Sequence, residues 1–127
     1  MGVPRDLLYT RNHQWVRLDK NSATVGISYY GQLQLGQIVF IDLPDVDKSV
    51  SASETLATIE SSKAAVEIQS PLSGTVIKVN ETLSKTPEYI NTSPYKDGWI
   101  CVLKMRKPDE KNLLLDAQAY DALLESI

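Results

Sequence analysis

The stretch that decides the fold is residues 55–69, which reads TLATIESSKAAVEIQ. Two runs of apolar and β-branched residues, 55–60 and 65–69, flank a small polar segment that ends in Lys63. Within the first run, odd-numbered and even-numbered residues face opposite ways, which is the alternation of a strand. The sequence therefore predicts two strands that present the long amine of Lys63 at an accessible tip.

Further short β segments surround this stretch. Residues 7–18 and 23–27 read as β-rich runs joined by a polar turn at 19–22, which predicts a hairpin. Strands are also expected over 38–43 and 75–80, the second of them after a turn at 71–74, which reads PLSG. The chain is therefore expected to be mainly β.

Helices are predicted at two places. Ser28 is a suitable N-cap for a short helix over 29–35, and Gly36 stands where a residue of positive φ would end it. In the tail, Pro108 suits a first helical turn and Asp116 suits an N-cap. The helical spacing of the apolar residues in the tail predicts a stripe that packs on the same domain, formed by Tyr120, Leu123, Leu124 and Ile127.

A weak internal repeat spans the centre of the chain. Residues 36–41 and 74–79 share one pattern at an offset of 38 positions, and residues 55–59 resemble residues 98–102. Chance similarity between short β patterns explains this as well as a quasi-twofold sandwich does, with Lys63 near the hinge of the latter. Residues 85–97 then form a polar insert.

The composition indicates one water-soluble globular domain over residues 1–127, because 43% of the residues are hydrophobic and 23% are charged. No apolar run approaches the roughly 18 residues of a spanning helix, and the first ten residues lack a secretory signal. The 13 basic residues are scattered among 16 acidic ones. No basic stripe is present for nucleic acid, so neither nucleic acid nor a membrane is an expected partner.

The residues available for catalysis are few. Cys101 and His13 are the single cysteine and the single histidine, which excludes an intrachain disulfide and a Cys/His zinc set. Cys101 lies in the apolar run 99–103 and is expected to be buried. His13 is expected to be packed or hydrogen-bonded, so we predict no catalytic residue and no metal site.

Lys63 is the residue whose setting suggests chemistry. A lysine between two β runs is ordinarily just an exposed turn residue. Here its neighbours are small and neutral on both sides, so the amine is a natural acylation site. Acylation replaces the ammonium with a neutral amide, and the tethered group visits other proteins at high local concentration.

Ten segments carry a resemblance to a known family. They are Tyr9-Thr10, His13-Gln14-Trp15-Val16, Val25-Gly26-Ile27-Ser28, Leu35-Gly36-Gln37-Ile38-Val39-Phe40, Leu43-Pro44, Glu60-Ser61-Ser62-Lys63-Ala64, Ser70-Pro71-Leu72-Ser73-Gly74, Val79-Asn80-Glu81, Asn91-Thr92-Ser93-Pro94-Tyr95 and Gly98-Trp99. Together they resemble the H protein of the glycine cleavage system, a lipoyl carrier, over about residues 7–124. The Glu-Ser-x-Lys-Ala motif alone marks only a lipoyl site.

The resemblance implies a lipoyl-domain-like barrel-sandwich hybrid with a short helix in its N-terminal half and C-terminal helices. It also implies lipoate in amide linkage to Lys63, with hairpin recognition by Glu60, Ser61, Ser62 and Ala64. The aminomethyl group of glycine would pass on this arm from glycine decarboxylase (P protein) to aminomethyltransferase (T protein). Dihydrolipoyl dehydrogenase (L protein) and a lipoyl ligase or transferase would complete the partners.

In the family the loaded arm folds into a surface cleft, and the matching positions here are Asn12, Gln14, Gln34 and Glu67. Three of these depart from the usual residues, since relatives have Glu at 14, often His at 34, and commonly Asp at 67. Gln14 brings no charge to a cationic amine, and a charge-assisted hydrogen bond is about twice as strong as a neutral one. Asp47 replaces a common glycine, and a left-handed conformation there is tolerable for Asp.

Other functions stay open at this point. An H-like carrier that serves lipoate relay or another lipoyl-dependent pathway fits the neutral cleft. A biotinyl carrier fits less well, because that family brackets its lysine with methionines. An interaction module or small hydrolase would have to use His13, Cys101 or the carboxylates. The expected location is the bacterial cytoplasm, or the mitochondrial matrix for a processed eukaryotic protein.

Overall fold

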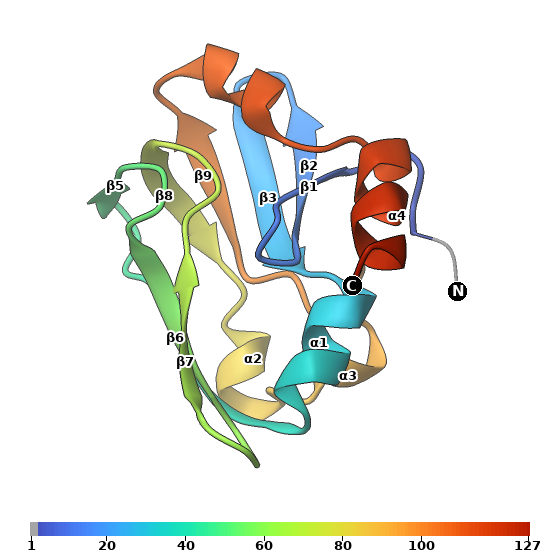
Figure 1. Ribbon diagram of the computed structural model, residues 1–127. Coiled ribbons are helices and arrows are strands. Elements are labelled where there is room, and N and C mark those ends of the chain that lie inside the picture. The colour runs from blue at the N-terminus through green and yellow to red at the C-terminus, as the bar shows by residue number, and fades with distance from the viewer. Residues whose placement is uncertain (1–2) are drawn as a thin grey trace.

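The chain folds into two antiparallel β-sheets around one main core, with short helices at their edges (Figure 1). The computed structural model describes residues 3–127. Within these residues the larger sheet has six strands, in the order β1-β2-β3-β9-β8-β5, and the smaller has three, β4-β6-β7. The bounds are β1 Leu8–Tyr9, β2 Gln14–Asp19, β3 Ser22–Ile27, β4 Ile38–Asp42, β5 Ser49–Val50, β6 Thr55–Ser61, β7 Ala65–Gln69, β8 Gly74–Val79 and β9 Cys101–Met105. The mainly β prediction is confirmed.

The first half of the chain follows its local signals. Strands β2 and β3 form the predicted hairpin. Helix α1, Tyr29–Leu35, begins at Ser28, whose Oγ accepts a hydrogen bond from the Gly31 amide at 3.1 Å. Gly36 ends the helix at φ 82° and ψ −163°, a conformation essentially restricted to glycine. Asp47 has φ 76°, so the aspartate does adopt positive φ at its turn.

The strand pairing favours the sandwich interpretation of the internal repeat over chance. The first half pairs β4 with β6 in the smaller sheet, and the second pairs β8 with β9 in the larger. Both pairings have a register shift, at Val39 in β4 and at Ile77 in β8. These residues stand at equivalent positions of the two halves, and both are about half exposed, at 53% and 46%.

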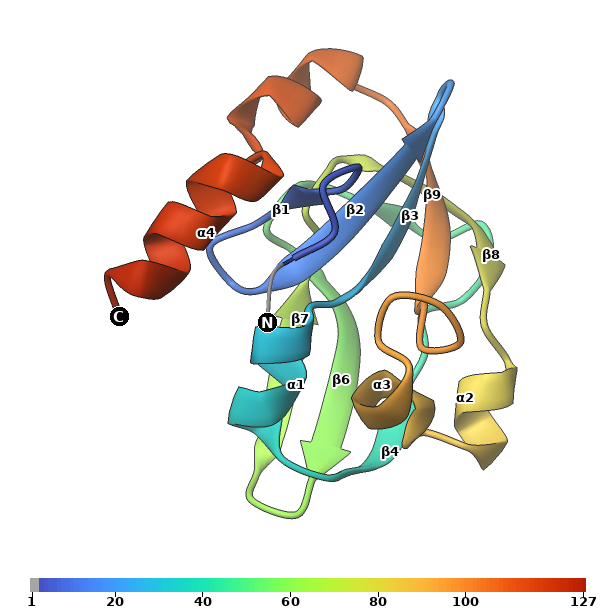
Figure 2. The same ribbon diagram turned by 90° about the vertical axis from the view of Figure 1, so that its right-hand side faces the viewer.

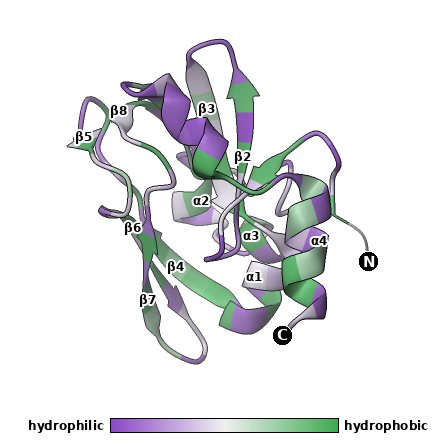
Figure 3. Cartoon of the chain, turned by 45° about the horizontal axis from the view of Figure 1, so that its top comes forward, coloured by the Kyte–Doolittle hydropathy of each residue, from purple (hydrophilic) through white to green (hydrophobic). Residues whose placement is uncertain are grey.

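The main core lies between the two sheets. It includes Ile59 of β6 and, from the larger sheet, Val25 and Leu103, all fully buried. Each such side chain contributes roughly 1.5–3 kcal/mol on burial. Cys101 is fully buried in the same core, as expected, and burial raises the pKa of its thiol to about 12. Figure 3 shows β4 as a largely hydrophobic strand, although its Phe40 is 49% exposed.

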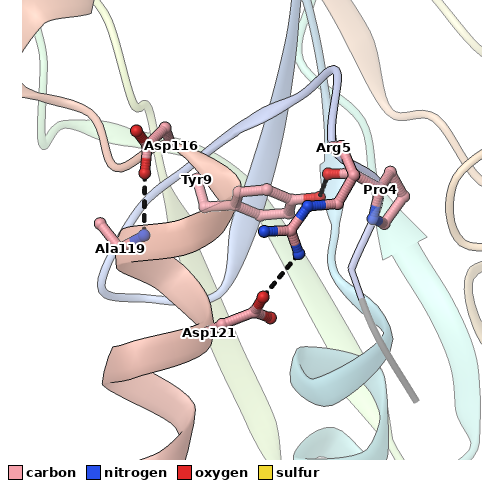
Figure 4. Close-up of polar contacts among 6 residues, drawn as sticks. All are labelled: Pro4, Arg5, Tyr9, Asp116, Ala119 and Asp121. Carbon is pink, nitrogen blue, oxygen red and sulfur yellow. Dashed lines mark hydrogen bonds and ion pairs between the residues drawn. The ribbon is translucent and has the colours of Figure 1, made fainter.

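The C-terminal helices form where the sequence predicts them. Pro108 begins a 3-10 helix, η1 (Pro108–Leu113), and Asp116 caps helix α4 (Ala117–Glu125) by accepting a hydrogen bond from the Ala119 amide at 2.8 Å (Figure 4). Between the two helices, Leu115 pairs with Tyr9 through hydrogen bonds of 2.7 and 2.8 Å.

Helix α4 packs on the N-terminal segment in a second, smaller apolar cluster. The ring of Tyr120 stacks on that of Tyr9 with centroids 4.4 Å apart. Arg5 forms an ion pair with Asp121 beside it, and the Tyr9 hydroxyl donates to the Pro4 carbonyl at 2.7 Å (Figure 4). The stacked rings and the ion pair therefore hold the N-terminal segment and α4 together.

One residue of the predicted apolar stripe is misplaced. Tyr120 is buried, and Leu123 and Leu124 are partly buried against the same cluster. Ile127 is 69% exposed, so its assignment to the stripe was wrong. The physical reason is that α4 ends at Glu125, and the helical spacing no longer applies beyond that residue.

Two helices that the sequence pattern did not predict lie just before the polar insert and within it. They are α2, Thr82–Lys85, and α3, Tyr89–Thr92, and α3 contacts α1 (Figure 2). Helices of four residues are too short to show an apolar periodicity. Among the helices of residues 3–127, none has the length and apolar character needed to cross a membrane.

Candidate functional site

The turn between β6 and β7 is organised by the hydroxyl of Ser61. Its oxygen accepts hydrogen bonds from the amides of Lys63 and Ala64, at 3.1 and 3.3 Å. The Ser61 amide in turn donates to the Ala64 carbonyl at 2.9 Å. Because these local bonds satisfy the backbone of the turn, the tip is a defined structure.

Lys63 lies at this tip and its side chain is exposed. Figure 1 shows the β6–β7 loop at the lower edge of the molecule, projecting past the other elements. A Cβ added to Gly36 would lie 3.3 Å from Cε of Lys63, so the stem of the lysine passes over the bare glycine backbone. The side chain is therefore exposed and lies outside the core.

The other hairpin residues lie beside Lys63. Ser62 and Ala64 are exposed, as is Glu60, which pairs with Ala65 across the hairpin. The Ser62 amide donates to the carbonyl of Gln37 at 2.9 Å, which ties the tip to the segment after α1. The structure thus brings the predicted recognition residues together, while their role in recognition stays a prediction.

A cleft of about 460 Å³ opens between residues 11–14, helix α1 and strand β7. All four residues predicted for a cleft line it: Asn12, Gln14, Gln34 and Glu67. Asn12 donates from Nδ2 to Oε1 of Gln69 at 3.0 Å, which links two walls of the cleft. The Glu67 carboxylate is exposed and accepts from the Thr55 hydroxyl at 2.9 Å.

The two glutamines of the cleft differ in burial. Gln34 is exposed on α1, whereas Gln14 is only 2% exposed. The Oε1 atom of Gln14 accepts a hydrogen bond from the Thr10 hydroxyl at 3.0 Å. This hydrogen bond orients the buried side chain of Gln14, and sequence reasoning revealed neither the contact nor the burial.

His13 also lines the cleft, which sequence reasoning missed. It has φ 68°, and its Nδ1 lies 2.8 Å from the hydroxyl of Tyr120, as expected for a hydrogen-bonded histidine. Burial lowers the pKa of His13, and burial raises the pKa of Tyr120 to about 12. The sequence offered one signal that His13 lines the cleft, namely its position directly before Gln14.

The structure separates the thiol from the imidazole. Cys101 lies in the main core, and His13 lies at the cleft against Tyr120. Across residues 3–127, no group of three or more His, Cys, Asp or Glu side chains is arranged to hold a metal ion. The chemistry that the site itself offers is an exposed amine on a hydrogen-bonded turn, near a cleft lined by both polar and apolar residues.

Two sheets in this arrangement, with a projecting hairpin between β6 and β7, belong to the class of lipoyl-domain-like barrel-sandwich proteins. The comparisons narrow the class. A family model described as Glycine cleavage H-protein matches residues 7–127. The chain belongs to this family, and the resemblance in the sequence is confirmed.

Individual relatives agree with the family. A glycine cleavage system H protein of Geobacillus kaustophilus is 43% identical over 124 residues, covering 98% of both chains. One of Salmonella arizonae is 47% identical over 125 residues, covering 98% of this chain and 97% of the relative. The crystal structure of a glycine cleavage system H protein from Mycobacterium marinum superposes with a TM-score of 0.86 at 30% identity, covering 96% and 98%. This match confirms the barrel-sandwich fold.

Proposed function

We propose that this chain is a lipoyl carrier of the glycine cleavage system, with lipoate in amide linkage to Lys63. The observation that carries the proposal is the exposed lysine on a hydrogen-bonded hairpin tip, in a chain of this family. Glu60, Ser61, Ser62 and Ala64 would present the lysine to a lipoyl ligase or transferase. Residues 1–127 would act as a single non-catalytic domain.

The residues around Lys63 fit such an arm. Gly36 leaves room beside the lysine stem, which a Cβ at that position would narrow to 3.3 Å. Strand β7 runs from the tip to the cleft, and Glu67 is four residues from Lys63, or about 13 Å along a strand. A lysyl stem plus lipoyl chain contains about ten bonds of roughly 1.5 Å, so its reach is of the same order.

The cleft would shelter the end of the arm. A bound lipoyl group supplies a disulfide that takes up and releases a one-carbon amine fragment. The exposed carboxylate of Glu67 offers a charge-assisted hydrogen bond to a cationic amine, and Gln14 offers a neutral acceptor held in place by Thr10. Asn12 and Gln34 would complete the polar part of the lining.

The partners follow from the family. Glycine decarboxylase, aminomethyltransferase and dihydrolipoyl dehydrogenase would act in turn on the arm, with the chemistry belonging to those enzymes and their cofactors. The relatives named above are bacterial, so we place the protein in a bacterial cytoplasm, or in the mitochondrial matrix if the chain comes from a processed eukaryotic protein. Their names favour glycine cleavage over lipoate relay.

Modification of Lys63 is tested by incubating the protein with a lipoate ligase, lipoate and ATP, followed by intact-mass measurement and peptide mapping. We expect the addition of one lipoyl group, on Lys63. Lys63→Arg keeps the charge but offers no acylable amine, and we expect it to stay unmodified with unchanged stability because the side chain is exposed. Unmodified wild-type protein, or equal modification of the variant, would refute the attachment site.

The glycine cleavage role is tested separately. Lipoylated protein is incubated with glycine decarboxylase and labelled glycine, and we expect label to accumulate on the carrier and to be discharged by aminomethyltransferase with tetrahydrofolate. Efficient lipoylation without any loading would instead favour the relay carrier. Streptavidin blotting of protein from cells would expose a biotinyl carrier.

A further inference from the structure

Asn91 connects three parts of the chain through one side-chain amide. It lies in α3, the short helix that contacts α1. Its Oδ1 accepts a hydrogen bond from the amide of Ile38 at 2.9 Å, and its Nδ2 donates to the Gly36 carbonyl and to Oε1 of Gln32, both at 2.9 Å. Both N–H groups and the oxygen of the amide therefore have partners.

Two of these bonds hold the segment 36–38 at its two ends. The segment leaves α1 through Gly36, whose φ of 82° and ψ of −163° are open to glycine but are only one of many conformations that this flexible residue could adopt. Holding so flexible a residue in one conformation requires contacts from elsewhere in the chain. Asn91 supplies such contacts at Gly36 and at Ile38, the residues on each side of Gln37.

The same segment supports the lysine hairpin. Gln37 accepts the hydrogen bond of the Ser62 amide at 2.9 Å, and Ile38 pairs with Ser61. Gly36 is the residue over which the Lys63 stem passes, since an added Cβ would lie 3.3 Å from the lysine Cε. The contacts run without a gap from Asn91, through segment 36–38, to the tip of the hairpin.

We propose that Asn91 is a positioning residue for Lys63, which fixes the support on which the acylated lysine is presented to other enzymes. This inference rests on the proposed role of Lys63 as the lipoyl attachment site. Loss of the amide should leave the β6–β7 hairpin paired but free it from segment 36–38. Only a fraction of the molecules then present the supported tip that a modifying enzyme recognises. This raises the apparent KM of that enzyme for the protein and leaves its kcat largely unchanged.

The test compares Asn91→Ala and Asn91→Asp with Asn80→Ala. Asn91→Asp retains an acceptor for the Ile38 amide but loses the donor to the Gly36 carbonyl. Asn80 is a matched control, because it is buried and its Nδ2 donates to the carbonyls of Asp97 and Trp99 at 2.8 Å, outside segment 36–38. Global stability by urea unfolding, amide hydrogen exchange at Ser62, and the KM and kcat of a lipoate ligase are measured for each.

We expect both Asn91 variants to exchange the Ser62 amide about tenfold faster than wild type, and to raise the ligase KM by a similar factor with kcat within about twofold. Asn80→Ala should lose comparable global stability while Ser62 exchange and KM stay within about twofold of wild type. Unchanged exchange in both Asn91 variants, or equal changes in Asn80→Ala, overturns the inference. So does failure of both Asn91 variants to fold while Asn80→Ala folds, since Asn91 would then be a purely structural residue.

The two proposals fail in different ways. If Lys63 is not the attachment site, wild-type protein stays unmodified by the ligase, whereas Ser62 exchange still reports whether Asn91 holds the tip. If wild type is modified and Ser62 exchange does not respond to Asn91, the attachment site stands and the positioning role is lost.

Discussion

The hydroxyl of Tyr120 lies 2.8 Å from Nδ1 of His13 and thereby joins the last helix to the wall of the cleft. The same hydroxyl lies 2.7 Å from Oγ of Ser28, the N-cap of α1. All three groups are satisfied when the Ser28 hydroxyl donates to the Tyr120 oxygen and the Tyr120 hydroxyl donates to Nδ1 of a neutral His13. One side chain of α4 therefore supports both the start of α1 and the residue beside Gln14.

Tyr120→Phe should lower the free energy of unfolding by about 1 kcal/mol, because it removes two hydrogen bonds and leaves the ring stacked on Tyr9. Urea unfolding followed by far-UV circular dichroism measures the loss. Tyr30→Phe is the matched control, since the Tyr30 ring also packs against His13, with centroids 4.7 Å apart. An equal loss in the control would show that the Tyr120 hydroxyl has no special role.

His13 should titrate below its usual pKa of 6.5, because burial disfavours the charged imidazolium. The unfolded chain then binds more protons than the folded one, so the stability contribution is complete above that usual value and declines as pH falls through the folded pKa. The single histidine gives one Hε1 signal for an NMR titration. The control is the same titration in concentrated urea, and an equal or higher pKa in the folded protein would contradict the prediction.

Gln14→Glu should destabilise the unmodified protein at neutral pH, since it places a carboxyl group where the side chain is 2% exposed. Burial raises the pKa of a carboxyl group, so the variant should approach wild-type stability at about pH 5 and lose on the order of 1–3 kcal/mol by about pH 8. Urea unfolding at both pH values measures this. Gln34→Glu, at an exposed cleft position, should be nearly neutral, and a pH-independent loss in Gln14→Glu would count against the burial argument.

The same variant tests the electrostatics of the cleft. A carboxylate at position 14 would face the cationic amine of a loaded arm, so we expect a larger loaded fraction than in wild type at equal glycine and decarboxylase. Labelled glycine on the lipoylated carrier measures that fraction. A loaded fraction equal to or below that of wild type would show that Glu67 and the neutral lining already suffice.

Gly36→Ala should cost about 1–3 kcal/mol of stability, because alanine does not readily adopt the backbone conformation at this position. It should also slow lipoylation, since the added methyl group would lie 3.3 Å from the Lys63 Cε. Unfolding experiments and ligase assays check both effects. The neighbouring Gln37→Ala keeps the carbonyl that holds Ser62 and should change neither, so an effect of similar size there would refute the explanation.

Cys101 should not react with a maleimide in the folded protein at about pH 8, since burial both raises its thiol pKa and blocks access. In concentrated urea the same thiol should react rapidly and completely. The rate of labelling in water then reports transient opening of the main core. Rapid labelling of the folded protein would contradict the burial of this strand.

The elements with a local signal in the sequence were predictable. Ser28 and Gly36 mark the two ends of α1, because a cap hydroxyl and a residue of positive φ act within one turn. The strands on either side of Lys63 follow from alternation and from the small residues between them. The internal repeat, which consists of two short sequence patterns, also agrees with the pairing of β4 with β6 and of β8 with β9.

The contacts that join distant segments were not predictable. Asn91 bonds to Ile38 across 53 positions, and Tyr120 bonds to His13 across 107. No pattern within either segment specifies such a partner, because it depends on how the sheets bring the segments together. The family resemblance predicted which polar residues line the cleft, but the burial of Gln14 is visible only in the folded structure.

The clasp between the N-terminal segment and α4 has a practical consequence. Helix α4 and the C-terminal end lie to one side of the molecule, whereas the β6–β7 hairpin projects from its lower edge (Figure 1), and Ile127 is exposed. Immobilisation on a sensor surface through an affinity tag added after Ile127 would leave Lys63 exposed to solution. Encounters with each enzyme of the cycle are then measurable one at a time on an immobilised carrier.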